Sequence, residues 1–178
     1  MEREIEVKVL NVDLSAMEKT LIEKGGVKIS DEQQETIVIN SSKHPIDDAS
    51  GYLRIRRTRS PRGDKTVCTF KEKKANDAVR IYDEHTVEID DVEEMLRIFE
   101  LLGYNLRDEG HKHRISYAYR GCRLDLDRWE EETYPAPYME IEGGSREAIQ
   151  DVIDDLGIDR RCVSTKSIAE LRKWQNKK

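Results

Sequence analysis

Two short segments of the sequence carry acidic side chains at alternate positions. Glu4 and Glu6 lie near the N-terminus, and Glu140 and Glu142 repeat the spacing far along the chain. Side chains two positions apart share one face of a β-strand, so each segment predicts a pair of carboxylates on a single face. Carboxylate oxygens are the ligands that hard divalent cations prefer, which favours Mg²⁺ or Mn²⁺ over zinc.

Basic side chains repeat the same alternate spacing. Arg54 and Arg56 form one pair, and Lys112 and Arg114 form another. A guanidinium group presents a planar fork of donors to phosphate oxygens, and an ammonium group supplies a point charge. Several bases on one enclosed surface repel one another, so we expect them to need an anionic partner, just as clustered carboxylates need a cation. A polyphosphate with a divalent metal ion satisfies both requirements.

The charged positions alternate with apolar ones, such as Ile5, Val7 and Val9, and this alternation is typical of strands. It predicts eight strands, over residues 4–10, 36–40, 52–56, 65–71, 84–89, 111–117, 123–127 and 139–142. Apolar residues at helical spacing predict four helices, over about residues 14–24, 91–102, 145–156 and 164–174.

The helices follow strands whose apolar face needs a cover, which leaves the charged faces to enclose a common space. Eight strands are about the number that closes into a barrel with room for one small ligand. We therefore predict an α+β fold, an eight-stranded and mostly antiparallel β-barrel. Its interior forms a charged tunnel, and its helices pack on the outside.

Composition narrows the class of protein. The 178 residues include 31 Lys and Arg against 37 Asp and Glu, a net charge of −6, which argues against a nucleic-acid partner. The length predicts one domain over residues 1–178. No apolar run approaches the roughly 18 residues that span a membrane, and the N-terminus lacks a secretory signal, so we expect a cytoplasmic protein without a membrane partner. The scattered Cys68, Cys122 and Cys162 argue against a disulfide framework.

The charged motifs, taken in chain order, resemble those of the CYTH superfamily, the triphosphate tunnel metalloenzymes. The matching motifs are Glu4-x-Glu6-x-Lys8, Leu53-Arg54-Ile55-Arg56, Thr69-Phe70-Lys71, Arg80 with Glu84 and Glu88, Lys112-x-Arg114, Leu126-Asp127, Glu140-x-Glu142 and Lys166-Ser167. The long first helix looks more like the class IV adenylyl cyclase and thiamine-triphosphatase branch. Ile168 stands where members often have Tyr, and Glu35-Thr36-Ile37 where they often have Asp-x-Tyr, which leaves the identity of the substrate open.

The resemblance implies a role for each charged residue. The metal ligands would be Glu4, Glu6, Asp127, Glu140 and Glu142. The triphosphate would be bound by Lys8, Arg54, Arg56, Lys71, Arg80, Lys112 and Arg114. The catalytic groups would be Lys8, Glu84 and Glu88, with the two acids lining the tunnel and assisting a metal ion or the nucleophile.

Two reactions would use these groups. In the reaction of a class IV adenylyl cyclase, which we favour, the ribose 3′-hydroxyl of ATP attacks the α-phosphorus and pyrophosphate leaves. In hydrolysis, water attacks the terminal phosphorus of thiamine triphosphate or inorganic tripolyphosphate. A non-catalytic module that binds a nucleotide or polyphosphate is a third alternative, although binding alone would need the bases more than the acids. The sequence leaves open whether the protein is a monomer or a homodimer.

Overall fold

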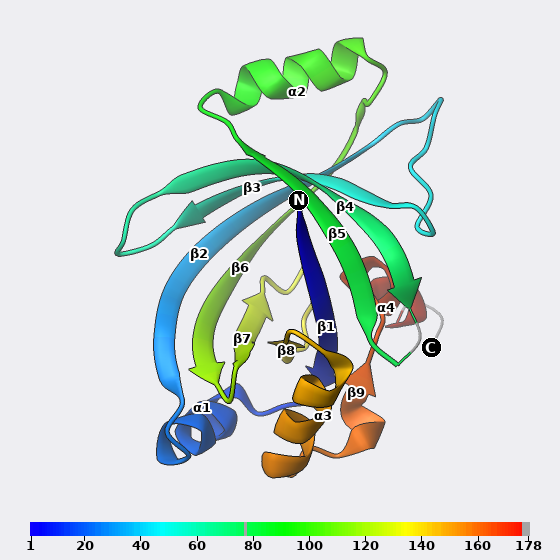
Figure 1. Ribbon diagram of the computed structural model, residues 1–178. Coiled ribbons are helices and arrows are strands. Elements are labelled where there is room, and N and C mark those ends of the chain that lie inside the picture. Colours follow the sequence, from blue (N-terminus) through cyan, green and yellow to red (C-terminus); the bar gives the residue numbers. More distant parts are fainter. Residues whose placement is uncertain (77, 176–178) are drawn as a thin grey trace.

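Eight β-strands close into a barrel in the computed structural model, which describes residues 1–76 and 78–175 (Figure 1). The strand order is β5-β4-β3-β2-β6-β7-β8-β1, and a further pairing of β5 with β1 joins the two edges. The strands are β1 (Glu2–Leu10), β2 (Val27–Asn40), β3 (Gly51–Arg59), β4 (Lys65–Asn76), β5 (Arg80–Glu88), β6 (Leu106–Tyr119), β7 (Cys122–Trp129) and β8 (Tyr138–Glu142). Neighbouring strands are antiparallel, so the predicted barrel is confirmed.

Strand β1 closes the barrel by pairing with two other strands. Its first half, from Glu2 to Glu6, pairs with β5, and its second half, from Glu6 to Leu10, pairs with β8. The two-residue strand β9 (Val163–Ser164) continues beside β1 where β5 stops. Closure removes the unpaired edges of the sheet. It also brings the two acidic segments together, since Glu6 lies directly opposite Glu142.

Strands β2 and β6 extend well beyond the predicted ranges 36–40 and 111–117. Each has 14 residues, and the two pair along nearly their whole length, from Val27 to Asn40. The shorter prediction was wrong because residues 27–35 carry polar side chains on both faces of the strand. Asp31 and Glu35 point outward and pair with His113 and Arg57, so no apolar alternation marks this half of the strand.

Three helices pack on the outer, apolar face of the barrel. Helices α1 (Leu14–Glu23) and α3 (Arg146–Asp155) cover a core that includes Val7 and Ile141, and α2 (Val92–Leu101) covers a second core around Ile55. Figure 1 shows α1 and α3 near one end of the barrel and α2 near the opposite end. None of the helices in the described part of the chain combines the length and apolarity needed to cross a bilayer.

Polar side chains fix where these helices begin. Asp13 accepts hydrogen bonds from the backbone N–H groups of Ser15 and Ala16, at 3.0 and 3.1 Å. Asp91 and Ser145 act in the same way at the starts of α2 and α3. These contacts satisfy donors that the first helical turn leaves without a partner. The predicted starts of the first three helices are confirmed to within a few residues.

The fourth helix, α4 (Ile168–Gln175), lies beside one mouth of the barrel. It begins later than predicted, because residues 163–164 form β9. Ser167 and Glu170 form a capping box, in which the Glu170 carboxylate accepts from the Ser167 N–H at 2.6 Å and the Ser167 hydroxyl accepts from the Glu170 N–H at 3.1 Å. Ile168 and Leu171 pack against Tyr134 and Tyr138.

Adjacent residues of α1 test the orientation of that helix. Leu21 is fully buried, whereas Ile22 is 58% exposed. We expect Leu21→Ala to lower the free energy of unfolding by about 2–5 kcal/mol, because it leaves a cavity beneath the helix. The matched Ile22→Ala should lower it by less than about 1 kcal/mol. Urea denaturation measures both, and equal losses would contradict this packing.

Candidate functional site

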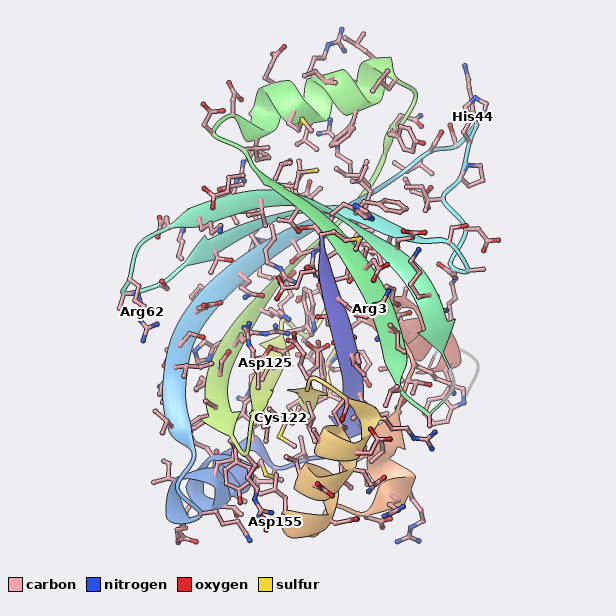
Figure 2. The ribbon with its side chains drawn as sticks, in the orientation of Figure 1. Arg3, His44, Arg62, Cys122, Asp125 and Asp155 are labelled. Carbon is pink, nitrogen blue, oxygen red and sulfur yellow. The ribbon has the colours of Figure 1, made fainter. Side chains whose placement is uncertain are left out.

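The inner faces of the eight strands enclose a cavity of about 500 Å³. Many charged side chains line it, and Figure 2 shows Asp125 in the interior of the barrel, whereas Arg62 lies at the tip of a hairpin outside. The predicted residues that line the cavity are Glu4, Glu6, Lys8, Arg54, Arg56, Lys71, Arg80, Glu84, Lys112, Arg114, Glu140 and Glu142. The alternation along each strand therefore turned these side chains inward as expected.

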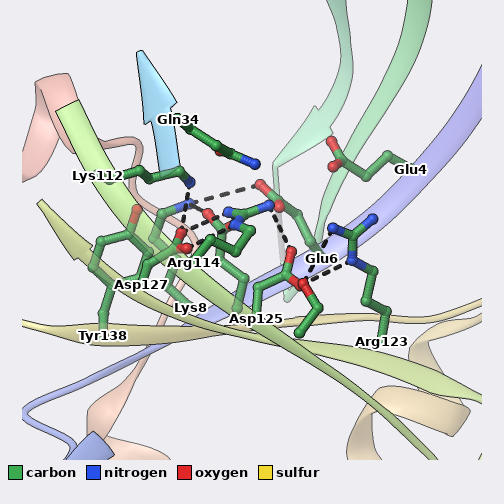
Figure 3. Close-up of polar contacts among 12 residues, drawn as sticks. Glu4, Glu6, Lys8, Gln34, Lys112, Arg114, Arg123, Asp125, Asp127 and Tyr138 are labelled. Atoms are coloured by element: carbon green, nitrogen blue, oxygen red, sulfur yellow. Dashed lines mark hydrogen bonds and ion pairs between the residues drawn. The ribbon is translucent and has the colours of Figure 1, made fainter. Parts of the chain in front are cut away.

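Arg114 is held by three carboxylates. Its guanidinium nitrogens lie 2.6 Å from carboxylate oxygens of Asp125, Asp127 and Glu140 (Figure 3). Lys112 donates to Asp127 at 2.7 Å. Burial and the nearby Arg114 lower the pKa of Lys112 to about 7, although Asp127 opposes this shift. These contacts fix the two bases of β6 against the acids of β7 and β8.

The other side of the barrel carries a second set of ion pairs. Lys71 contacts both Glu4 and Glu84, and Lys8 lies 2.7 Å from Glu140. Arg80 reaches Glu6 at 3.3 Å. The expectation that like charges crowd the tunnel until a ligand arrives was therefore wrong, because bases and acids from neighbouring strands neutralise one another. Only a few charged groups remain for a ligand.

Arg56 is the clearest of these remaining groups. Within residues 1–76 and 78–175, no carboxylate lies within ion-pair distance of it, and the buried Nε atoms of Arg54 and Arg56 have no hydrogen-bond acceptor. Thr36, which faces Arg56 across the β2–β3 pair, also has a buried hydroxyl oxygen without a partner. Burial, followed by repulsion from Arg54 and Arg114, lowers the pKa of Arg56 to about 10. An anion placed here would satisfy donors whose burial is otherwise costly.

Glu142 is the corresponding acidic group. The described side chains include no base within ion-pair distance of its carboxylate. Burial, with repulsion from Glu4 and Asp125, raises the pKa of Glu142 to about 7. An excess of negative charge therefore collects near Glu142, and a cation would relieve it.

The predicted metal ligands do not form a finished site. In the part of the chain that the structure covers, no three acidic, histidine or cysteine side chains are already arranged to hold a metal ion. Asp127 and Glu140 are engaged by Lys112, Arg114 and Lys8. The all-oxygen chemistry of Glu142, its cross-strand neighbour Glu6 and the next inward residue Glu4 nevertheless suits Mg²⁺ or Mn²⁺, and the raised pKa of Glu142 marks that place.

Two predicted residues lie differently from the rest. Asp127 is fully buried behind Lys112 and Arg114 and does not itself line the cavity. Glu88 lies outside, with its side chain 72% exposed and 2.6 Å from Lys65. It shares a face with Glu84, but β5 pairs with β1 only as far as Glu84, so the strand has left the barrel four residues later. The prediction that Glu88 lines the tunnel is thus corrected.

Several residues that point into the barrel were not predicted from the sequence. Asp125 and Arg123 are two and four positions before Asp127, so the alternation alone places them on the same face of the strand. They pair with each other at 2.8 Å. Figure 3 shows Asp125 between Arg114 and Arg123. The aromatic residues Tyr52 and Tyr82 also line the cavity. They lie two positions from other inward residues of their strands, and so on the same face, but nothing in their residue type marked them.

The sequence profile of the CYTH domain matches residues 2–166. This profile match covers every strand and the first three helices. No curated protein matches the sequence.

Solved structures with the same fold cover nearly the whole chain. A protein of Pyrococcus horikoshii OT3 has a TM-score of 0.81 and 22% identity, with 97% of this chain and 99% of that chain covered. A proposed adenylate cyclase of Vibrio parahaemolyticus has a TM-score of 0.78 and 14% identity, with coverage of 97% and 98%. A Hippeastrum protein, described as an adenylyl cyclase candidate with a dominant triphosphatase activity, has a TM-score of 0.67 and 16% identity, with coverage of 100% and 97%. Identities this low establish likeness of fold alone.

The raised pKa of Glu142 predicts how stability depends on pH in metal-free buffer. Between its ordinary value of 4.5 and about 7, the folded protein keeps a proton that the unfolded chain has lost. This group's contribution is therefore present at low pH and is lost as pH rises through that window. We expect Glu142→Gln to gain stability relative to wild type when urea denaturation is repeated from about pH 5 to pH 8. Glu23→Gln, on the exposed side of α1, is the control, and an unchanged difference for Glu142→Gln would contradict the assignment.

Proposed function

Since this chain belongs to the CYTH family, we propose that it is a divalent-metal-dependent enzyme that binds a triphosphate inside the barrel and cleaves one of its phosphoanhydride bonds. The observation that carries the proposal is the pair of Arg54 and Arg56. Their buried Nε–H donors lack acceptors within the described residues. Phosphate oxygens supply acceptors with the charge and planar geometry that guanidinium groups bind best.

The distribution of bases supports a chain of phosphates over a single one. Inward-facing bases come from the six strands β1, β3, β4, β5, β6 and β7. They include Lys8, Arg54, Arg56, Lys71, Arg80, Lys112, Arg114 and Arg123. A triphosphate extended along the cavity would contact several of these strands at once. Each base that holds a carboxylate would exchange part of that contact for a phosphate contact, so the net charge of the interior would demand cations as well.

A metal ion supplies that positive charge. We assign Glu142, Glu6 and Glu4 as the residues that would hold Mg²⁺ or Mn²⁺, because no base among the described residues lies within ion-pair distance of Glu142. A bound divalent ion would neutralise phosphate oxygens and lower the cost of charge that develops on the leaving group. Asp127 and Glu140, in this proposal, orient Lys112, Arg114 and Lys8 toward the substrate.

Proton transfer in either reaction needs a group that can accept a proton near neutral pH. Glu142 holds the metal ion in this proposal, so it is not the group that accepts the proton. For Glu84, burial opposes ionisation, but Lys71 and Arg54 outweigh it and keep the pKa below its usual value. Glu84 therefore remains a carboxylate that holds Lys71, and Lys8 supplies a positive charge beside the reacting phosphate.

Cyclisation and hydrolysis differ only in the nucleophile and the phosphorus attacked. In cyclisation, the bond from O3′ to the α-phosphorus forms, the α–β bridging bond breaks, and the hydroxyl proton passes to a base. In hydrolysis, the bond from water to the terminal phosphorus forms, the β–γ bridging bond breaks, and a water proton is released. The same basic residues and carboxylates serve both reactions.

A product assay tests the proposal. The wild-type protein is incubated separately with ATP, thiamine triphosphate and inorganic tripolyphosphate, in Mg²⁺ and in Mn²⁺, and the products are identified. Cyclic AMP with pyrophosphate would identify a cyclase, and orthophosphate would identify a hydrolase. Glu142→Gln should lose turnover, and Arg56→Gln should raise the KM for the triphosphate by about 10- to 100-fold, the equivalent of one or two charge-assisted hydrogen bonds.

Arg57→Gln provides the matched control. Arg57 follows Arg56 directly but points outward, where it lies 3.0 Å from Glu35. Its substitution should leave KM near the wild-type value. No turnover of any substrate with either metal would leave only a binding module and would defeat the proposal. Equal effects of the two arginine substitutions would contradict the assignment of Arg56.

A further inference from the structure

The buried polar atoms that lack a hydrogen-bond partner lie on one wall of the interior. Within residues 1–76 and 78–175, all five such side-chain atoms belong to the neighbouring strands β2 and β3. They are Oγ of Ser30, Oε1 of Gln34, Oγ1 of Thr36, and Nε of Arg54 and of Arg56. An anion at Arg54 and Arg56 satisfies the two nitrogen donors, but it does not explain the oxygens of β2.

Gln34 and Thr36 occupy successive inward positions of β2 and are only 4% and 6% exposed. Thr36 lies directly opposite Arg56 of β3, and Gln34 lies directly opposite Lys112 of β6. Thr36 lines the cavity, and Figure 3 shows the amide group of Gln34 turned toward the ionic side chains of the interior. Both oxygens therefore lie beside bases that we assign to the triphosphate.

A hydrogen bond to Glu32 determines which end of the Gln34 amide is free. Nε2 of Gln34 donates to the Glu32 carboxylate at 2.8 Å. Because a carboxylate only accepts, the amide nitrogen must face Glu32 and the oxygen Oε1 must face away from it. Oε1 of Gln34 can only accept a hydrogen bond, whereas the Thr36 hydroxyl can accept and donate at the same time.

The chemistry of these two oxygens selects their ligand. An ionised phosphate oxygen is itself an acceptor, so it cannot satisfy Oε1 of Gln34. A metal cation would be repelled by Arg56 and Lys112, which lie opposite these residues. A neutral donor remains, and a water molecule supplies two protons, one for each oxygen. Such a donor also removes the free-energy cost of burying an acceptor without a partner.

Resting on the proposed function, we infer that Gln34 and Thr36 hold the water molecule that attacks the terminal phosphorus of a triphosphate bound at Arg56. Hydrogen bonds from this water to Oε1 of Gln34 and Oγ1 of Thr36 leave an oxygen lone pair to face the phosphorus. A glutamine can orient the attacking water in phosphoryl transfer. Neither residue is charged, so neither competes with the phosphate for the bases around it.

The terminal phosphate itself accepts the proton in this step. The bond from the water oxygen to the terminal phosphorus forms, and the β–γ bridging bond breaks, with its electron pair leaving on the diphosphate product. One water proton passes to the Thr36 hydroxyl while the proton of that hydroxyl passes to an oxygen of the terminal phosphate. The products are orthophosphate and the diphosphate, and Thr36 ends with its hydroxyl intact.

Steady-state kinetics test the two residues, in Mg²⁺ and in Mn²⁺, with whichever of the three triphosphates the wild-type protein hydrolyses fastest. Thr36→Val and Gln34→Leu keep the approximate size of each side chain and remove the oxygen. We expect each to lower kcat by about 10- to 100-fold, the loss of one hydrogen bond to the reacting water. The KM, and the calorimetric Kd in EDTA, should stay within about threefold of wild type. Thr36→Ser, which keeps the hydroxyl, should recover most of the lost kcat.

Thr66→Val is the matched control. Thr66 lies on β4, two positions before Cys68 of the outer core, and does not line the cavity. Its substitution should leave kcat and KM near the wild-type values. Thermal unfolding of each variant verifies that it is folded.

Hydrolysis in water enriched in the heavy isotope of oxygen identifies the phosphorus that is attacked. Attack on the terminal phosphorus places the label in orthophosphate, whereas attack on another phosphorus places it in the other product. We expect the label in orthophosphate alone.

Label in the other product would overturn the inference. An unchanged kcat in both variants would also overturn it, as would a higher KM and Kd without a fall in kcat, which would make Thr36 a phosphate-binding residue. A protein that cyclises ATP but releases no orthophosphate would retain the proposed function and contradict this inference. No turnover with either metal would defeat the proposed function, and the inference with it.

Discussion

Compensation of charge inside a closed barrel is the constraint on which this structure depends. Closure turns the ionic face of every strand toward a common interior, where an unpaired charge is expensive. Ion pairs between strands neutralise most of these charges, and Arg114 alone contacts three carboxylates. The acids around Arg114 come from neighbouring strands, β7 and β8. The same contacts therefore neutralise the charge of this base and hold its side chain in place.

Incomplete compensation then defines where ligands would bind. Arg54 and Arg56 retain buried donors without acceptors in the described part of the protein, and Glu142 keeps a raised pKa beside other carboxylates. An anion is therefore favoured near Arg54 and Arg56, and a cation near Glu142. A complex of a metal ion with a triphosphate would satisfy both places in the one cavity.

Period-two alternation was enough to predict the barrel and most inward residues, because side-chain direction in a strand follows from parity. Alternation does not predict contacts between strands. The pairing of Lys71 with Glu4 and Glu84 depends on how β1, β4 and β5 are aligned with one another. Glu88 had the right parity but lies past the point where β5 leaves β1. Asp125 could have been found from its parity with Asp127, whereas the polar halves of β2 and β6 gave no alternation to detect.

Thermal unfolding of the metal-free protein with inorganic tripolyphosphate tests the central claim most directly. If the interior lacks an anion, millimolar tripolyphosphate should raise the Tm by several degrees above the value in sodium chloride of equal ionic strength, since a ligand at about 100 times its Kd adds about 2.7 kcal/mol. Orthophosphate, which reaches fewer bases, should raise it much less. An identical Tm in tripolyphosphate and in the matched salt would show that the interior is already electrically complete, and would contradict the account.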